Sequence, residues 1–319
     1  MAQERVLVTG GAGFIGSNIV DALLADGSWT VRVLDSFATG RRGNLAHCLD
    51  DIELVEGDIR DLETVEEAVD GVQLILHQAA LPSVSRSVKA PVTTNAVNVE
   101  GTLKLLSAAR RAGVRRVVLA SSSSVYGDGH ELPKTEQMPP RPMSPYAVTK
   151  LAAENFFRVF SEIYGLETLA LRYFNVFGPR QDPTSQYSGV IARFALSALH
   201  GVPYRVYGDG LQSRDFSYID NVVHANLLAL RAPRVNGEVV NVACGERITL
   251  LDMIAVLNEL VGREVPVEFV DPRPGEVRHS QAAIERAATL LDYRPVVDFR
   301  TGMARTFAWY EEQESAPVV

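Results

Sequence analysis

The feature that most constrains the fold is a glycine-rich turn near the start of the chain. Gly10, Gly13 and Gly16 give the spacing G-x-x-G-x-x-G between a β-branched run, Arg5–Thr9, and an amphipathic stretch, Ile15–Ala25. Glycines allow a tight turn and let the backbone approach a pyrophosphate that rests on the N–H groups of the helix start. The residues expected to line this cradle are Gly10, Gly13, Phe14, Ile15 and Gly16. The pattern therefore predicts a strand, a turn and a helix that bind a dinucleotide.

Short apolar runs alternate with helical stretches over the first 120 residues. The runs are Thr30–Leu34, Ile52–Glu56, Leu74–His77 and Arg116–Ala120, and the helical stretches include Leu62–Val69 and Asn95–Ala112. Strands that are apolar on both faces and separated by helices indicate a parallel sheet covered on both sides. The predicted fold class is α/β, with a doubly wound parallel Rossmann sheet.

Near Arg172 the regular alternation fails, and a smaller α/β unit is expected to follow. Its elements are strand-like runs at Tyr204–Val206, Glu238–Val242 and Val265–Val270, helices around Ile191–Leu199, Val222–Leu230 and Leu250–Val261, two further helices, and a frayed tail at Glu311–Val319. We expect residues 1–174 plus about 217–243 to form the dinucleotide-binding domain. Residues from about 175–216 plus 244–319 are expected to form the substrate-binding domain.

An acidic residue ends the second predicted strand. Asp35 lies 19 residues after the last glycine of the cradle, where a carboxylate accepts hydrogen bonds from the adenosine ribose and repels a 2′-phosphate. This position predicts NAD as the cofactor, in preference to NADP. Arg41 and Arg42 would argue for NADP, but we interpret them as solvated loop residues. Asp58 and Ile59 follow the third strand and are expected to meet the adenine.

A tyrosine and a lysine lie four positions apart in a Y-x-x-x-K pattern. Pro145 suits a helix start, so Tyr146 and Lys150 are expected one turn apart on the same helix face. A nearby ammonium favours the phenolate, and we expect it to lower the pKa of Tyr146 from about 10 toward physiological pH. Tyr146 is then a general base for a hydroxyl proton, and Lys150 also reaches the nicotinamide ribose. Such a pair alone usually lies on a solvated helix face, but its combination with the cradle favours catalysis.

A row of serines follows the run Arg116–Ala120. Ligands of parallel sheets bind at the carboxyl ends of the strands, so Ser122, Ser123 and Ser124 are expected to face the nicotinamide and the substrate. The alternative is a serine-rich turn that caps a strand end. The segment carries no carboxylate, and elimination of water or decarboxylation needs an extra acid or base there. Hydroxyls alone favour oxidation and re-reduction at a carbon that bears a hydroxyl.

These segments resemble the extended short-chain dehydrogenase/reductase superfamily, and nearly the whole chain resembles its UDP-hexose 4-epimerases, particularly the UDP-N-acetylglucosamine 4-epimerase subgroup. The further segments that carry the resemblance are Gln78–Ser87, Leu171–Gly178, Gly208–Phe216 and Arg273–Ser280. The resemblance implies roles for Ser122, Tyr146 and Lys150 in catalysis, for Ala79 and Asn98 beside NAD, and for Ser83 beside the substrate.

Arginines in these segments are candidates for binding the UDP pyrophosphate, because a guanidinium donates to phosphate oxygens in a fixed fork. Arg214 and Arg273 are the first candidates and Arg278 is a third, with a surface ion pair as the alternative for each. Asn175 is expected to hydrogen-bond the first phosphate or the sugar. Pro82 departs from the family pattern, since many glucose-type enzymes have a lysine there.

Ser280 bears on the choice of sugar. The resemblance places it where a bulky tyrosine excludes N-acetyl groups in glucose-only enzymes. A serine predicts room for UDP-GlcNAc and UDP-GalNAc besides UDP-Glc and UDP-Gal, unless it is a loop residue without consequence. The implied reaction is NAD-dependent epimerisation at C4 through a 4-keto sugar. The alternatives are a UDP-glucuronate 4-epimerase, an NAD-dependent sugar-nucleotide dehydrogenase or reductase, and a non-catalytic NAD sensor.

Composition disfavours several other classes. The 31 Lys and Arg against 39 Asp and Glu give a net charge of −8, which argues against nucleic-acid and anionic-membrane binding. Two cysteines and six scattered histidines show no metal-ligand spacing, so no metal site is expected. No signal peptide or membrane span is expected either, and a cytoplasmic enzyme is predicted.

The helix Tyr146–Gly165 is apolar on more than one face. Together with Asn95–Ala112 it resembles the family's four-helix interface, so a homodimer is predicted.

Overall fold

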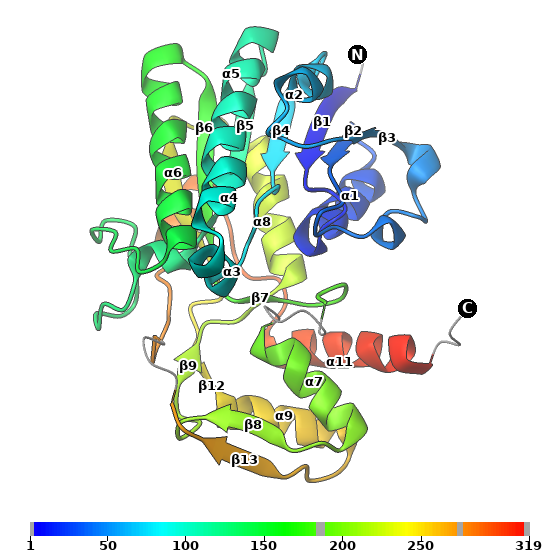
Figure 1. Cartoon of the computed structure of the whole chain (residues 1–319), viewed down its shortest axis with the longest axis vertical. Coiled ribbons are helices and arrows are strands. Elements are labelled where there is room, and N and C mark those ends of the chain that lie inside the picture. The colour runs from blue at the N-terminus through cyan, green and yellow to red at the C-terminus, as the bar shows by residue number, and fades with distance from the viewer. Residues whose placement is uncertain (1–2, 183–188, 273–276, 316–319) are drawn as a thin grey trace.

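The computed structural model describes residues 3–182, 189–272 and 277–315. The strands of its main sheet are β1 (Glu4–Thr9), β2 (Trp29–Asp35), β3 (Ile52–Glu56), β4 (Leu74–His77), β5 (Arg116–Ser122), β6 (Glu167–Tyr173) and β11 (Glu238–Val242). Within the described residues these seven strands have the order β11-β6-β5-β4-β1-β2-β3, and all neighbours are parallel (Figure 1). The direction of strand addition reverses at β1, which confirms the predicted doubly wound α/β fold.

Helices cover both faces of this sheet (Figure 1). One layer contains α1 (Phe14–Asp26) and α8 (Ile219–Arg231), and the other contains α2 (Leu62–Val69), α5 (Thr102–Ala112) and α6 (Pro145–Tyr164). Alternate strand residues serve the two layers: Leu7 joins the core beside α2, α5 and α6, whereas Val6 and Val8 join the core beside α1 and α8. Both strand faces are therefore apolar. None of the helices in the described ranges is long and apolar enough to cross a membrane.

A smaller lobe lies beyond the carboxyl ends of the sheet strands (Figure 1). Its elements are β7 (Val176–Phe177), α7 (Val190–His200), β8 (Tyr204–Tyr207), β9 (Ser213–Arg214), β10 (Ser217–Tyr218), β12 (Ile248–Thr249), α9 (Leu250–Val261), β13 (Val267–Val270) and α11 (Phe299–Ser315). α10 (Glu285–Leu291) packs instead against β11 and α8. β8 and β13 form a parallel pair, and α7, α9 and α11 pack against one another. The chain leaves the main sheet after β6 and returns to it with α8 and β11.

Two predicted elements differ from the structure. The stretch expected as one helix over Asn95–Ala112 starts earlier and contains a π-helical segment. Its parts are α4 (Pro91–Asn95), η3 (Ala96–Gly101) and α5. The tail expected to fray from Glu311 continues as α11 to Ser315, because Phe307 and Tyr310 are buried and hold the helix on the lobe. The remaining short helices are α3 (Val84–Lys89), η1 (Arg42–Asn44), η2 (Leu49–Asp51) and η4 (Ser123–Tyr126).

Two buried arginines on sheet strands fix the ends of the covering helices. Arg32 Nη1 donates to three carbonyls at the end of α2, at 2.7 to 3.2 Å. Arg116 Nη1 donates to the carbonyls of Ala229 and Leu230 at the end of α8, at 2.8 and 2.9 Å. The carbonyls of a last helical turn have no partner within the helix and attract cations. Each arginine therefore joins one helical layer to the sheet.

Candidate active site

A cavity of about 960 Å³ lies at the carboxyl ends of the sheet strands and extends into the smaller lobe. The predicted site residues that line it are Gly10, Gly13, Phe14, Ile15, Gly16, Asp35, Asp58, Ile59, Ala79, Ser83, Ser122, Ser123, Ser124, Tyr146, Lys150, Asn175, Arg214 and Ser280. Asn98 and Arg278 do not line it, and Arg273 lies outside the described residues. Segments far apart in the sequence thus meet around one space.

The glycine turn is shaped by close backbone approaches. A Cβ on Gly10, whose φ is +73°, would lie 2.7 Å from the backbone nitrogen of Ala79, and a Cβ on Gly16 would lie 2.1 Å from the carbonyl oxygen of Gly10. Among the described residues, no side chain caps the start of α1, and its first turn has no acidic residue. The N–H groups at that end are left for an anion, so this turn fits a pyrophosphate.

Asp35 borders the cavity and is held in place by backbone N–H groups. Its two carboxylate oxygens accept hydrogen bonds from the N–H groups of Ala12 and Phe37, each at 2.8 Å. Burial raises the pKa of this carboxyl, and the two N–H donors oppose that rise. Asp58 is instead paired with Arg60 at 2.6 Å, and this contact lowers its pKa. Both carboxylates border the cavity, where a dinucleotide offers hydroxyl and amine donors.

Tyr146 and Lys150 lie one turn apart on α6 and both border the cavity. Nζ of Lys150 is 5.9 Å from the centroid of the Tyr146 ring and donates to the carbonyl oxygen of Ala120 at 2.7 Å. A hydrogen bond with Ser122 lowers the pKa of Tyr146, but burial outweighs it and raises that pKa to about 12. Burial also lowers the pKa of Lys150 to about 8.

The expectation that Lys150 brings the pKa of Tyr146 toward neutrality is wrong for the chain alone. Removing water from the pocket disfavours the phenolate and the ammonium alike, and the amine is engaged with a backbone carbonyl. A further positive charge beside the phenol is needed to favour its anion. The oxidised nicotinamide ring of NAD carries such a charge.

An ion pair that the sequence analysis missed lies beneath these residues. Glu154, one turn beyond Lys150 on α6, accepts hydrogen bonds from Nε and Nη2 of Arg172 at 2.9 and 2.8 Å and from the Ser121 hydroxyl. Both partners are buried. The carboxylate also favours the charged form of Lys150. The signal in the sequence was the extension of Y-x-x-x-K to a third residue at the same spacing, Glu154.

Asn98 was expected to line the NAD pocket, but it is not among the described residues that border the cavity. Its Oδ1 accepts from the backbone nitrogen of Leu81 at 2.8 Å, and its Nδ2 donates to the Thr149 hydroxyl at 3.1 Å. Both ends of the amide are therefore engaged with protein, and the residue lies in the π-helical segment η3. Asn98 therefore ties the cavity wall near Leu81 to α6 without facing the cavity.

His77, at the end of β4, was assigned no role from sequence. Its Nδ1 lies 2.7 Å from the Thr9 hydroxyl and its Nε2 lies 2.9 Å from the Thr102 hydroxyl. Thr102 donates its own proton to the carbonyl oxygen of Asn98 at 2.7 Å, so the ring donates from Nε2 and accepts at Nδ1. Complete burial lowers the pKa of His77 to about 3. The neutral ring joins the strand before the glycine turn to the π-helical segment.

Asp215, to which the sequence analysis gave no role, joins several segments of the smaller lobe next to the cavity. Its carboxylate accepts hydrogen bonds from the backbone nitrogens of Cys244, Gly245 and Ala282 at 2.9 to 3.1 Å. Burial raises its pKa to about 6, against the effect of these donors. Its carbonyl oxygen accepts from Nδ2 of Asn175 at 2.9 Å. Four separate stretches of chain are therefore held together next to the cavity.

Arg278 was predicted as a third pyrophosphate ligand, and the structure does not bring it to the cavity. Its guanidinium pairs with Asp209 at 2.7 Å on the surface, where both side chains are about half exposed. Arg214, by contrast, borders the cavity. The alternative of a surface ion pair, raised for each arginine, describes Arg278.

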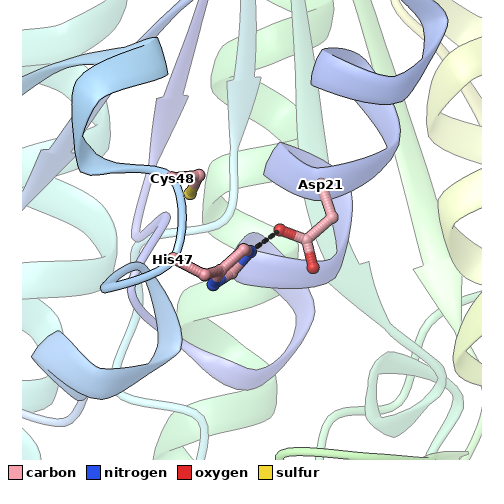
Figure 2. A group of neighbouring side chains, drawn as sticks. All are labelled: Asp21, His47 and Cys48. Carbon is pink, nitrogen blue, oxygen red and sulfur yellow. Dashed lines mark hydrogen bonds and ion pairs between the residues drawn. The ribbon is translucent and has the colours of Figure 1, made fainter.

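One group of metal-ligand types exists in the described part of the chain (Figure 2). Asp21 on α1 lies 2.8 Å from Nε2 of His47, and Cys48 lies beside them (Figure 2). The second carboxylate oxygen of Asp21 pairs with Arg180 at 2.6 Å, and the Cys48 thiol donates to the carbonyl of Leu45. These contacts satisfy the three groups and place a guanidinium where a cation would bind, so we interpret the group as a link between α1 and neighbouring loops.

The geometry is that of a dinucleotide cradle joined to a Tyr–Lys–Ser pocket. A model of the NAD dependent epimerase/dehydratase family matches residues 6–243. The chain belongs to this family. Membership confirms the resemblance seen in the sequence and the prediction of NAD as cofactor.

Several epimerases align with nearly the whole length of this chain. The UDP-glucose 4-epimerase of Mycolicibacterium smegmatis is 39% identical over 313 residues, covering 97% of this chain and 99% of that protein. The solved UDP-N-acetylglucosamine 4-epimerase of Methanobrevibacter ruminantium, in complex with UDP-N-acetylmuramic acid, is 36% identical with a TM-score of 0.93, covering 98% and 100%. The UDP-glucuronic acid 4-epimerase of Bacillus cereus, with UDP-glucuronic acid and NAD, is 32% identical with a TM-score of 0.89, covering 97% and 99%.

The buried pair beneath the site leads to a stability prediction. Replacing Glu154 by Gln leaves the Arg172 guanidinium buried without its counter-charge, so Glu154→Gln is expected to lower the free energy of unfolding by about 3–5 kcal/mol. Glu162→Gln is the matched control, because Glu162 pairs with Arg158 on the exposed side of the same helix. The control is expected to cost less than about 0.5 kcal/mol. Urea unfolding measures both, and equal losses would contradict the prediction.

Proposed function

We propose that this family member epimerises UDP-hexoses at C4 by transient oxidation to a 4-keto sugar. The observation that carries the proposal is the convergence of Tyr146, Lys150 and Ser122 on a cavity that also holds the glycine cradle. The serine segment at the end of β5 carries hydroxyls and no carboxylate, which suits oxidation and re-reduction at a hydroxyl-bearing carbon. The three relatives named above are epimerases at this same carbon.

In this mechanism Tyr146 removes the proton of the sugar 4-hydroxyl, and Ser122 holds the reacting oxygen by a hydrogen bond. The glycine cradle and Asp35 would hold NAD, which would supply the acceptor for the C4 hydride and return it to the opposite face. Lys150 adds positive charge beside the phenol and reaches the nicotinamide ribose. The 4-keto sugar turns about its bond to the diphosphate while the diphosphate stays bound. No net oxidation results, so NAD acts as a resident catalyst.

We propose that each of the two parts of the chain binds one of the two ligands. Residues 1–174 with about 217–243 bind NAD, and residues about 175–216 with 244–319 bind the nucleotide sugar. Arg214 is the proposed pyrophosphate ligand, and Asn175 and Ser83 are proposed sugar or phosphate contacts. The buried hydroxyl oxygen of Ser124 has no hydrogen-bond partner among the described residues, which supports its role as a substrate contact.

We propose UDP-GlcNAc and UDP-GalNAc as preferred substrates, beside UDP-Glc and UDP-Gal. Ser280 borders the cavity, and its small side chain leaves space for an acetamido group. The runner-up is UDP-glucuronate, which the Bacillus cereus relative binds in its solved structure. A C6 carboxylate requires a cation or several hydroxyls near C6.

We also propose that the protein is a homodimer through a four-helix bundle formed by α5, α6 and their counterparts. α6 and the adjoining helix α4 present exposed apolar side chains, among them Val148 at 52% exposure and Val92 at 81%. Val88 on α3 extends this patch at 64% exposure. Apolar side chains gathered on neighbouring helices favour burial against a second copy.

Tyr146→Phe tests the mechanism. The variant keeps the ring but has no proton acceptor, so turnover is expected to fall by roughly 100- to 10,000-fold. The fold and the content of bound NAD should be retained, as measured by thermal unfolding and by release of the cofactor on denaturation. Tyr164→Phe, at the exposed end of α6, is the matched control and should keep normal turnover. Near-normal turnover of Tyr146→Phe would refute the mechanism.

Ser280→Tyr tests the substrate proposal. A ring at this position fills the space proposed for the acetamido group, so kcat/KM for UDP-GlcNAc should fall by at least about tenfold. UDP-Glc serves as the internal control, and its kcat/KM should change by less than about threefold. Chromatography of the products, without added NAD, measures both activities. Parallel losses for the two sugars would show that Ser280 does not select the sugar.

Light scattering tests the dimer. The wild-type protein is expected at twice its chain mass of 34.8 kDa. Val148→Glu places a charge within the proposed interface, where it loses its hydration, and should shift the protein toward the monomer. Val202→Glu is the control, because Val202 is similarly exposed but lies after α7 in the smaller lobe. A wild-type monomer at micromolar concentration would overturn the proposal.

A further inference from the structure

A hydrogen-bonded relay in the smaller lobe has no part in the chemistry proposed above. His279 borders the cavity next to Ser280. Its Nδ1 lies 2.9 Å from the hydroxyl oxygen of Ser213, and that oxygen accepts a hydrogen bond from Nε of Arg247 at 3.1 Å. Arg247 also approaches the ring itself, and a guanidinium can only donate, so Nδ1 is an acceptor and the Ser213 hydroxyl donates its proton to it.

This arrangement selects one tautomer of the ring. A terminal nitrogen of Arg247 lies 3.4 Å from Nδ1 as well, so both neighbours of this nitrogen are donors. The neutral ring therefore carries its proton on Nε2. Within the described ranges of the chain, no residue forms a hydrogen bond with Nε2. The Nε2–H group is a donor left for a ligand in the cavity that His279 borders.

The charges around this ring are mostly positive. Arg214 on β9, Arg247 before β12 and Arg278 in the same segment face it, and Asp209 after β8 is the acidic group. Burial and the three guanidinium groups lower the pKa of His279. The imidazole is therefore neutral at neutral pH. A neutral N–H donor that is surrounded by guanidinium groups suits an anion with several acceptor oxygens.

We propose that His279 binds the diphosphate of the nucleotide sugar as a neutral Nε2–H donor, and that Ser213 and Arg247 are positioning residues that hold this tautomer. The inference rests on the proposed function and adds a substrate ligand to it. A neutral donor contributes a hydrogen bond without adding a further positive charge to a site that already contains guanidinium groups. Its contribution is also independent of pH near neutrality, which an unconstrained histidine cannot offer.

UDP affinity tests the ligand role. Isothermal titration calorimetry with UDP on the NAD-loaded protein at about pH 7.5 compares His279→Ala with the wild type. Loss of a donor to a charged acceptor is expected to weaken binding roughly 10- to 100-fold. His200→Ala is the matched control, because His200 is exposed on α7 and pairs with Glu314 away from the cavity. Unchanged affinity of His279→Ala, with a normal melting temperature, would overturn the proposal.

The pH dependence of binding tests the positioning role. UDP-glucose is the probe, since its diphosphate does not titrate near neutrality, and Tyr146→Phe is the background that prevents turnover. With the relay intact, the dissociation constant should vary by less than about threefold between about pH 6 and about pH 8. The double variant Ser213→Ala/Arg247→Ala removes both donors and frees Nδ1 for protonation beside the diphosphate, so binding should tighten on acidification, by at most about tenfold per pH unit. Tightening on acidification with the relay intact, lost in His279→Ala, would refute the neutral donor.

Binding measurements distinguish the proposed function from the proposed role of His279. A wild-type protein that binds neither UDP nor UDP-glucose overturns the proposed function and this inference together. A protein that binds UDP with full dependence on Arg214 and no dependence on His279 keeps the proposed function and overturns only the inference. In the supporting case, KM for the nucleotide sugar rises in His279→Ala while kcat stays within about threefold, because the ring contacts the diphosphate and not the reacting carbon.

Discussion

Burial opposes charge on the two groups that carry the proposed chemistry, and much of the surrounding structure follows from that opposition. The phenol of Tyr146 has a pKa of about 12 and the amine of Lys150 a pKa of about 8, both because water is excluded. Glu154 restores part of the ammonium charge, and Arg172 in turn neutralises Glu154. A cationic ring bound in the cavity would therefore favour the phenolate form of Tyr146 over the neutral phenol.

Much of the architecture could be predicted from local patterns. The glycine spacing, the apolar runs and the acidic end of β2 each depend on residues close in sequence, so the strand–turn–helix start and Asp35 were found. The parallel sheet followed from strands apolar on both faces, since such strands need a helical layer on each side. Tyr146 and Lys150 were found because i and i+4 positions share a helix face.

The errors concern contacts that no local pattern encodes. Arg278 was assigned to the cavity by its residue type, but its partner Asp209 lies 69 positions away. Asn98 lies in a π-helical segment and is engaged with Leu81 and Thr149, which lie 17 and 51 positions away. Asp215 and His77 act through backbone and hydroxyl partners contributed by several segments, so their roles emerge only once the chain is folded.

The return of the chain to the main sheet has a consequence for how the protein is made. β11 is the edge strand beside β6, yet it is separated from β6 by the stretch that builds α7, β8 and α8. During synthesis, the backbone of β6 on that side stays unpaired until residue 242 has left the ribosome. A nascent chain truncated before Glu238 exposes a ready template for intermolecular pairing, so translation pauses in this interval favour aggregation over folding.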